Sequence, residues 1–151
     1  IYLKKFKNKV DGNKKIILKS EFIKTINLIE VNFPNSKRDI MIIYLLFNTQ
    51  LKLNEILSLK KLDFKDNFQF VKVNNKIISL DKDVVKYLTN YKIDNESYLF
   101  TNNNGNVLSR QSVWKFIKKY NCKLSLNLSI DILNRSYKIN KMLESFNKEE
   151  L

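Results

Sequence analysis

Apolar residues recur at helical spacing through the first third of the chain. A first stripe predicts a helix that begins at a Ser20 cap and ends before Pro34; the stripe consists of Phe22, Ile23, Ile26 and Ile29. Ser36 is placed to cap a second helix, and the unbroken apolar run 40–47 within it indicates a helix buried on all sides. A short third helix is predicted from the inward-facing residues Leu53, Ile56, Leu57 and Leu59.

The spacing of apolar residues then changes. Two short β-prone runs lie on either side of Asn74-Asn75, which predicts a β-hairpin around these asparagines. The runs consist of Phe68, Phe70, Val71 and Val73, followed by Ile77, Ile78 and Leu80.

Helical spacing returns in the second half of the chain. Asp81 or Asp83 is expected to cap a helix that carries Val84, Val85, Leu88 and Tyr91. An extended segment at 98–100 and a turn at 102–106 lead to a helix with a Ser109 cap and a core face of Val113, Phe116, Ile117 and Tyr120. A last helix is expected from about Ser129 through Met142. This order of elements predicts a mostly α, α+β domain with a small antiparallel β-hairpin or sheet.

Length and composition define the class of protein. With 151 residues, one domain is expected, which we place at 19–151, after a basic linker or N-terminal extension at 1–18. The single cysteine, Cys122, excludes a disulfide framework and favours a reducing cytosol. Because there is also no histidine, we expect no metal and no cofactor. The longest apolar run is far shorter than a membrane-spanning helix, so no membrane partner is expected.

The net charge of +13 and the pI near 9.7 point to a polyanionic partner, such as nucleic acid or a membrane surface. Lysine, asparagine and isoleucine are abundant along the whole chain, as AT-rich coding DNA would also produce. Charge alone therefore leaves both nucleic-acid binding and compositional bias open.

Ordered motifs around the buried second helix are more specific. Arg38-Asp39 comes before the apolar run, and Thr49-Gln50-Leu51-Lys52-Leu53-Asn54-Glu55-Ile56 and Leu59-Lys60-Lys61-Leu62-Asp63-Phe64 follow it. This set resembles the tyrosine recombinases of the phage-integrase family, which carry Arg-Asp, a buried helix, Thr-Gly-Leu-Arg-Ile-Ser-Glu-Leu and Leu-Lys-x-x-Asp-Ile. The hairpin, Tyr98-Leu99-Phe100 and Leu108-Ser109-Arg110 follow in the family's order, so that the resemblance covers roughly residues 19 to 142.

The resemblance implies the helical catalytic-domain fold of this family and a chemistry on DNA. In the family a tyrosine attacks a DNA phosphate and forms a phosphotyrosine. Two arginines hold the phosphoryl oxygens, a histidine or similar residue assists, and a hairpin lysine protonates the leaving oxygen. In this sequence the hairpin lysine corresponds to Lys72 or Lys76.

The sequence departs from the family at most of these positions. Lys52 stands in place of the first arginine and keeps its charge, but it lacks the planar fork that binds two oxygens at once. In the second cluster, Asp131 stands where the family has histidine and Asn134 where it has the second arginine. Arg135 is one position further along, which on a helix turns its side chain about 100° away.

No tyrosine follows Tyr137, whereas the family's nucleophile lies well beyond the second cluster. Tyr137 corresponds to a core aromatic residue of the family, and Tyr120 belongs to the apolar face of its own helix. We therefore predict that both pack in the core.

Basic side chains in the regions that the family places along DNA are candidates for phosphate contacts, although each alone is equally typical of a solvated surface. They are Lys60, Lys61, Lys65, Arg110, Lys115, Lys118 and Lys119. Gln111, near the start of its helix, carries an amide that suits adenine.

Three hypotheses follow. The first is a DNA-binding domain of the recombinase type with impaired strand cutting, in DNA recombination, integration, or plasmid or chromosome maintenance. The second is a divergent active recombinase or relaxase, and the third is a protein-interaction module on the same fold. The first predicts double-stranded DNA as the partner, with a homo-oligomer or a related recombinase subunit as a second partner, and a cytoplasmic location at the nucleoid or a plasmid.

Overall fold

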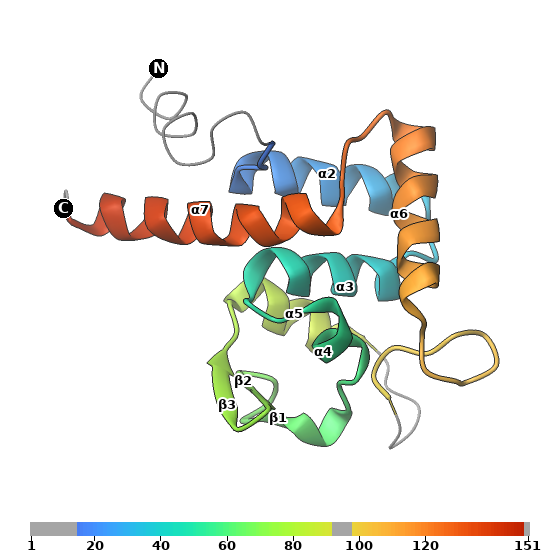
Figure 1. Cartoon of the computed structure of the whole chain (residues 1–151), viewed down its shortest axis with the longest axis horizontal. Coiled ribbons are helices and arrows are strands. Elements are labelled where there is room, and N and C mark those ends of the chain that lie inside the picture. The colour runs from blue at the N-terminus through green and yellow to red at the C-terminus, as the bar shows by residue number, and fades with distance from the viewer. Residues whose placement is uncertain (1–14, 92–97, 150–151) are drawn as a thin grey trace.

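A computed structural model of the chain describes residues 15–91 and 98–149 (Figure 1). The expected basic extension and its turn fall mostly on residues 1–14, outside the described residues. The helices are α2 (Lys19–Asn32), α3 (Lys37–Asn48), α4 (Leu53–Leu57), α5 (Lys82–Asn90), α6 (Arg110–Leu124) and α7 (Ile130–Glu149). A mostly helical domain with one small antiparallel sheet confirms the predicted fold class.

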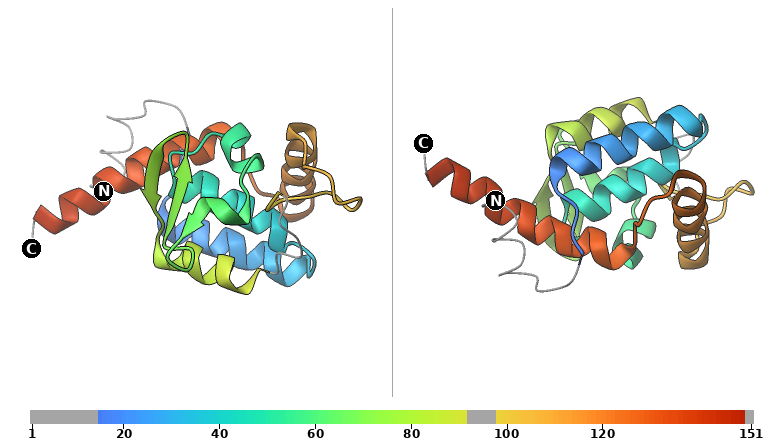
Figure 2. Two further views of the ribbon diagram at one scale, coloured as in Figure 1. Left: turned by 90° about the horizontal axis from the view of Figure 1, so that it is seen from below. Right: turned by 90° about the horizontal axis from the view of Figure 1, so that it is seen from above.

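Helix α3 is the centre of the domain. Every residue from Asp39 to Phe47 is buried, so the prediction of a helix covered on all sides is confirmed. Its neighbours are α2, α4, α5 and α7 (Figures 1 and 2). The rings of Phe22 and Phe47 stack 3.8 Å apart between α2 and α3, which adds aromatic contact to the apolar burial that drives this packing.

The predicted hairpin is confirmed, within a sheet that has one more strand. Strands β2 (Phe70–Val73) and β3 (Lys76–Ser79) pair antiparallel, with Val73 opposite Lys76. Asn74 and Asn75 both take positive φ, as a two-residue turn of the type I′ class requires. The unpredicted strand β1 (Phe64–Lys65) pairs with β2 and gives the order β1-β2-β3. It is only two residues long and follows a 3-10 turn (Lys61–Asp63), so it carries too little alternation to be recognised from sequence.

Several expectations about individual residues are wrong. Helix α2 begins one residue before Ser20, with Leu18 as the N-cap, and Ile23 of its supposed stripe is 40% exposed. Phe68 lies in the turn between β1 and β2 with φ 68° instead of in a strand. Leu59 is buried as expected but lies beyond the end of α4. In these cases tertiary packing outweighs a local preference.

The predicted caps of the later helices are largely confirmed. Ser109 is the N-cap of α6, and its hydroxyl accepts a hydrogen bond from the Ser112 backbone N–H at 3.2 Å. Asp81 is the N-cap of α5. Helix α7 begins next to Ser129 as predicted but continues to Glu149, well past Met142, and its end extends beyond the rest of the domain (Figure 1).

The segment before α2 is fixed to α7. Ile16 is 4% exposed, and the backbone N–H of Ile17 donates to the Ser136 hydroxyl at 2.8 Å. The Asn140 amide donates to the Ile17 carbonyl at 2.9 Å. Residues 15–18 are therefore packed onto the helical body, although we had counted them with the extension.

Candidate nucleic-acid interface

The residue that replaces the family's first arginine, Lys52, lies at the start of the short helix α4. Lys52 is its N-cap and is exposed. The Lys52 backbone N–H donates to Glu55 Oε1 at 2.9 Å, and Asn74 Nδ2 donates to Glu55 Oε2 at 2.9 Å. One carboxylate thus ties the start of α4 to the turn of the β2–β3 hairpin. Sequence reasoning missed this bridge, because Glu55 and Asn74 are 19 positions apart in the chain.

The two candidate hairpin lysines point in different directions. Lys72 pairs with Ile77, and Val73 pairs with Lys76. Because paired residues share a face and neighbours along a strand alternate, Lys72 and Lys76 lie on opposite faces of the hairpin. Lys72 lines a cavity of about 360 Å³ together with Asn54, Glu55, Asp63 and Asn74, among others, whereas Lys76 is not part of its wall.

Helix α6 is tied to the same place. Arg110 Nη1 donates to Asn54 Oδ1 at 2.9 Å, which joins the first residue of α6 to α4. Arg110 and Asn54 are both exposed, so the guanidinium keeps access to solvent.

The candidate DNA contacts of α6 spread over its exposed face. At about 100° per residue, Gln111, Lys115 and Lys118 cluster opposite the core face of the helix. Arg110 and Lys119 lie about 180° apart at the two edges of this face. Arg110 contacts α4, whereas the Lys119 ammonium lies 5.1 Å from the centre of the Phe33 ring, at the end of α2.

The remaining candidate lysines come after α4 in the chain, between the end of the helix and the end of strand β1. Lys60, Lys61 and Lys65 are all exposed. The Lys60 ammonium lies 5.3 Å from the centre of the Tyr98 ring, and Lys65 Nζ donates to the Leu62 carbonyl at 3.3 Å.

The second cluster lies near the start of α7. Asp131 is exposed and lines a cavity of about 460 Å³ whose wall also includes Arg110, Trp114 and Lys118 of α6. Asn134 is partly buried. The guanidinium of Arg135 donates to the Lys15 carbonyl at 3.1 Å, on the side of α7 that holds the segment before α2.

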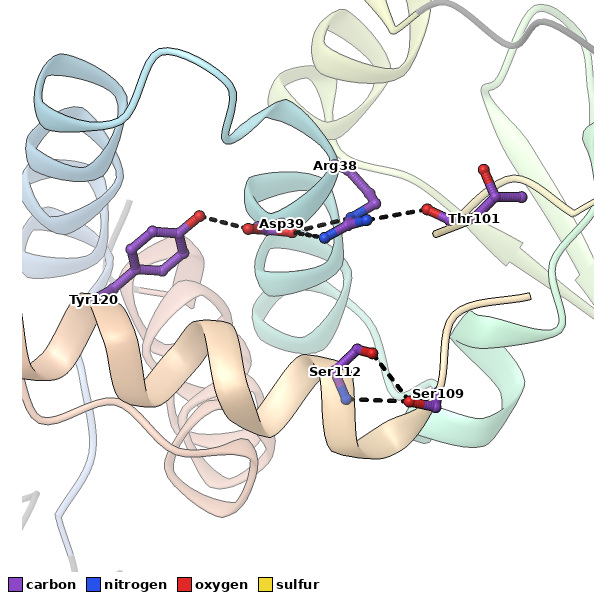
Figure 3. Close-up of polar contacts among 6 residues, drawn as sticks. All are labelled: Arg38, Asp39, Thr101, Ser109, Ser112 and Tyr120. Carbon is purple, nitrogen blue, oxygen red and sulfur yellow. Dashed lines mark hydrogen bonds and ion pairs between the residues drawn. The ribbon is translucent and has the colours of Figure 1, made fainter. Parts of the chain in front are cut away.

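A buried carboxylate, Asp39, pairs with the partly exposed Arg38 and links α3 to α6 (Figure 3). Arg38 Nη2 lies 2.9 Å from Asp39 Oδ1, and Arg38 Nη1 donates to the Thr101 carbonyl at 3.0 Å. The Tyr120 hydroxyl donates to the other oxygen of Asp39. Burial, and then this hydrogen bond, raise the pKa of Tyr120. The sequence signal for this ion pair is the position of Asp39 at the edge of the apolar run 40–47, because a charged residue that is buried there requires a partner.

Of the two tyrosines predicted in the core, Tyr120 is 1% exposed, as expected. Tyr137 is only partly buried, and its ring lies 5.9 Å from the Lys141 ammonium. It is on the rim of the helical body, so the prediction of a core position is wrong for this residue.

No cluster of histidine, cysteine, aspartate and glutamate that could hold a metal ion occurs among residues 15–91 and 98–149. Over the same residues, no helix combines the length and apolar character that a membrane crossing requires.

Comparison with solved structures defines the class of fold. The chain superimposes on the crystal structure of XerA recombinase with a TM-score of 0.67 at 18% identity, over 82% of this chain and 49% of that one. It also matches the Tn1549 transposon integrase, solved in complex with circular intermediate DNA, with a TM-score of 0.61 at 16% identity, over 85% and 53%. The domain therefore has the fold of a tyrosine-recombinase catalytic domain.

Sequence comparison gives the family. The profile described as "Phage integrase family" matches residues 17–134. Tyrosine recombinase XerD of Staphylococcus epidermidis is 32% identical over 124 residues, which are 73% of this chain and 42% of the relative. Tyrosine recombinase XerA of Pyrococcus horikoshii is 30% identical over 120 residues, 71% and 42%. The chain belongs to the phage integrase family, and it spans less than half the length of these relatives.

Proposed function

We propose that this chain is the DNA-binding part of a recombinase-type catalytic domain that acts in DNA recombination or integration with impaired strand cutting. Its relatives are named tyrosine recombinases, and one structural neighbour is an integrase bound to DNA. We further propose double-stranded DNA as its partner, with a second copy or a related recombinase subunit beside it.

The observation that carries this proposal is the convergence of three elements on α4. Glu55 bonds both the start of α4 and the hairpin turn, and Asn54 bonds Arg110 of α6. Cations from three separate elements, Lys52, Lys72 and Arg110, are thereby held around one short helix. A phosphate backbone is the ligand that such a set of exposed cations attracts most strongly.

Impaired cutting is proposed from the side chains at the two positions where the family has arginine, beside α4 and near the start of α7. Lys52 offers a point charge where two parallel hydrogen bonds to a phosphate would require a guanidinium. Asp131 would repel a phosphate. Arg135, the arginine closest in sequence to the second position, is bonded to the Lys15 carbonyl.

The interface is tested by titrating a fluorescent duplex with charge-matched variants and following its anisotropy. We expect Lys72→Gln and Arg110→Gln each to weaken binding by about fivefold, the order of magnitude for one phosphate contact. Lys24→Gln, which removes the same charge from the exposed surface of α2, should change it less than about twofold. Equal effects of all three variants would mean that net charge alone drives binding, and would contradict the proposed interface.

Lys72 lies beside α4 on the hairpin, where the family has the lysine that protonates the leaving oxygen. This favours one alternative, a divergent enzyme that still cuts DNA. That alternative predicts a covalent protein–DNA species on a nicked suicide duplex, visible on a denaturing gel. It also predicts that this species disappears with Lys72→Ala and with one Tyr→Phe variant. A trapped species with both properties would overturn the proposal of impaired cutting.

A further inference from the structure

A third cavity shares no lining residue with the two described above. It has a volume of about 620 Å³, within the usual range for small-ligand pockets, and lies between α2, α3 and α5. Figure 2 shows α3 between α5 on one side and α4 on the other. The charged and aromatic residues of its wall include Glu30, Lys37, Tyr44, Asp83, Lys86 and Tyr87.

The hydroxyl of Tyr44 is a polar group on the wall of this cavity. The residue is 7% exposed, and its ring packs against Phe22 at 5.1 Å and against Tyr87 at 4.7 Å between centroids. Its hydroxyl has no hydrogen-bond partner among the described residues, whereas the neighbouring Tyr87 hydroxyl donates to Glu30. The Tyr44 oxygen is not cut off from solvent, because the residue lines the wall of the cavity, and it is therefore available to bond a ligand that enters.

Acidic residues set the electrostatic environment of the two tyrosine hydroxyls, although the chain carries +13. Burial, and then the negative charges of Asp83 and Glu30, raise the pKa of Tyr44 to about 12. Burial, the hydrogen bond to Glu30 and the same two charges raise the pKa of Tyr87. The two carboxylates therefore dominate at the hydroxyls, even though Lys37 and Lys86 also line the wall.

We propose that this cavity binds a small protonated alkylamine. The ammonium group has three donors, which suit the free Tyr44 oxygen and the carboxylates of Asp83 and Glu30. The faces of the Tyr44 and Tyr87 rings add cation–π attraction. A chain of such high positive charge repels cations elsewhere, so saturable binding of an amine requires a local site of this kind.

The test is calorimetric titration of the whole chain with 1,4-diaminobutane in the absence of DNA. We expect saturable binding that Tyr44→Phe weakens by about tenfold, the effect of losing one hydrogen bond to a charged group. Asp83→Asn should weaken it similarly. A thermal melt of each variant checks that it is folded.

A pair of lysine variants tests whether the ligand is a cation or an anion. Lys86→Met should tighten amine binding, because it removes a repulsive charge from the wall, whereas Lys123→Met on the exposed face of α6 should leave it unchanged. Absence of saturable binding, an unchanged affinity of Tyr44→Phe, or binding of inorganic phosphate that Lys86→Met weakens would each overturn the proposal. None of these readouts involves DNA, so they are independent of the proposed function.

Discussion

Asp39 joins α3 to α6 through one buried hydrogen bond. It is 6% exposed and charged, in the middle of an apolar core. Arg38 neutralises it from one side, and the Tyr120 hydroxyl satisfies its second oxygen from α6. A buried carboxylate with both partners holds two helices in one relative position, and it becomes costly once one partner is removed.

Tyr120→Phe is therefore expected to destabilise the protein by about 1–3 kcal/mol, the usual cost of an unsatisfied buried group. Urea denaturation measures the change. Tyr98→Phe is the matched control, because it leaves the ring next to Lys60 in place, and its effect should stay within about 0.5 kcal/mol. A Tyr120→Phe variant as stable as the wild type would show that Asp39 does not need the hydroxyl.

The same residue makes stability depend on alkaline pH. Because burial raises the pKa of Tyr120 in the folded state, the unfolded chain loses this proton first as the pH rises above about 10. The stabilising effect of the hydroxyl is thus complete below that pH and is lost above it. Urea denaturation at about pH 9.5 and at about pH 11.5 measures this loss. The difference in stability between the wild type and Tyr120→Phe should be smaller at the higher pH. A constant difference would contradict the assignment.

At the residue level the sequence predicted candidates but not contacts. Lys52, Arg110 and the hairpin lysines were recognisable from their place in ordered motifs. The bonds of Glu55 to Asn74 and of Arg110 to Asn54 were not, because they join residues 19 and 56 positions apart. Whether Lys72 or Lys76 faces α4 is decided by strand register, which the hydrophobic pattern fixes poorly here because apolar residues lie on both faces of the hairpin.

Helix α3 shows what a hydrophobic pattern predicts well. Its unbroken apolar run leaves no polar face, so burial on all sides is the only arrangement that keeps it out of water. Helix starts and the two-residue strand β1 were less accessible, since caps and short strands carry weak local signals.

The central place of α3 predicts a large cost for a cavity within it. Leu45→Ala should destabilise the protein by about 2–5 kcal/mol, because Leu45 is 0% exposed and its neighbours cannot all collapse into the space. Val31→Ala, at a position 80% exposed on α2, should change stability by less than about 0.5 kcal/mol. Similar midpoints of urea unfolding for the two variants would mean that α3 is not the core helix.

For the whole molecule, the fold and the family were predictable because the motifs occur in a fixed order along the chain, and the XerA comparison and the family profile confirm both. Charge was the weaker guide, since lysine is abundant on every part of the sequence. What separates a DNA-binding surface from compositional bias is the arrangement of cations around α4.

The most direct test of the central claim is the salt dependence of duplex binding. We expect a plot of log affinity against log salt concentration to fall with a slope of about −4 or steeper, which corresponds to roughly five phosphate contacts. Lys72→Gln and Arg110→Gln should each make the slope shallower by about 1. No binding at low salt, or a slope that neither variant changes, would contradict a phosphate-binding surface centred on α4.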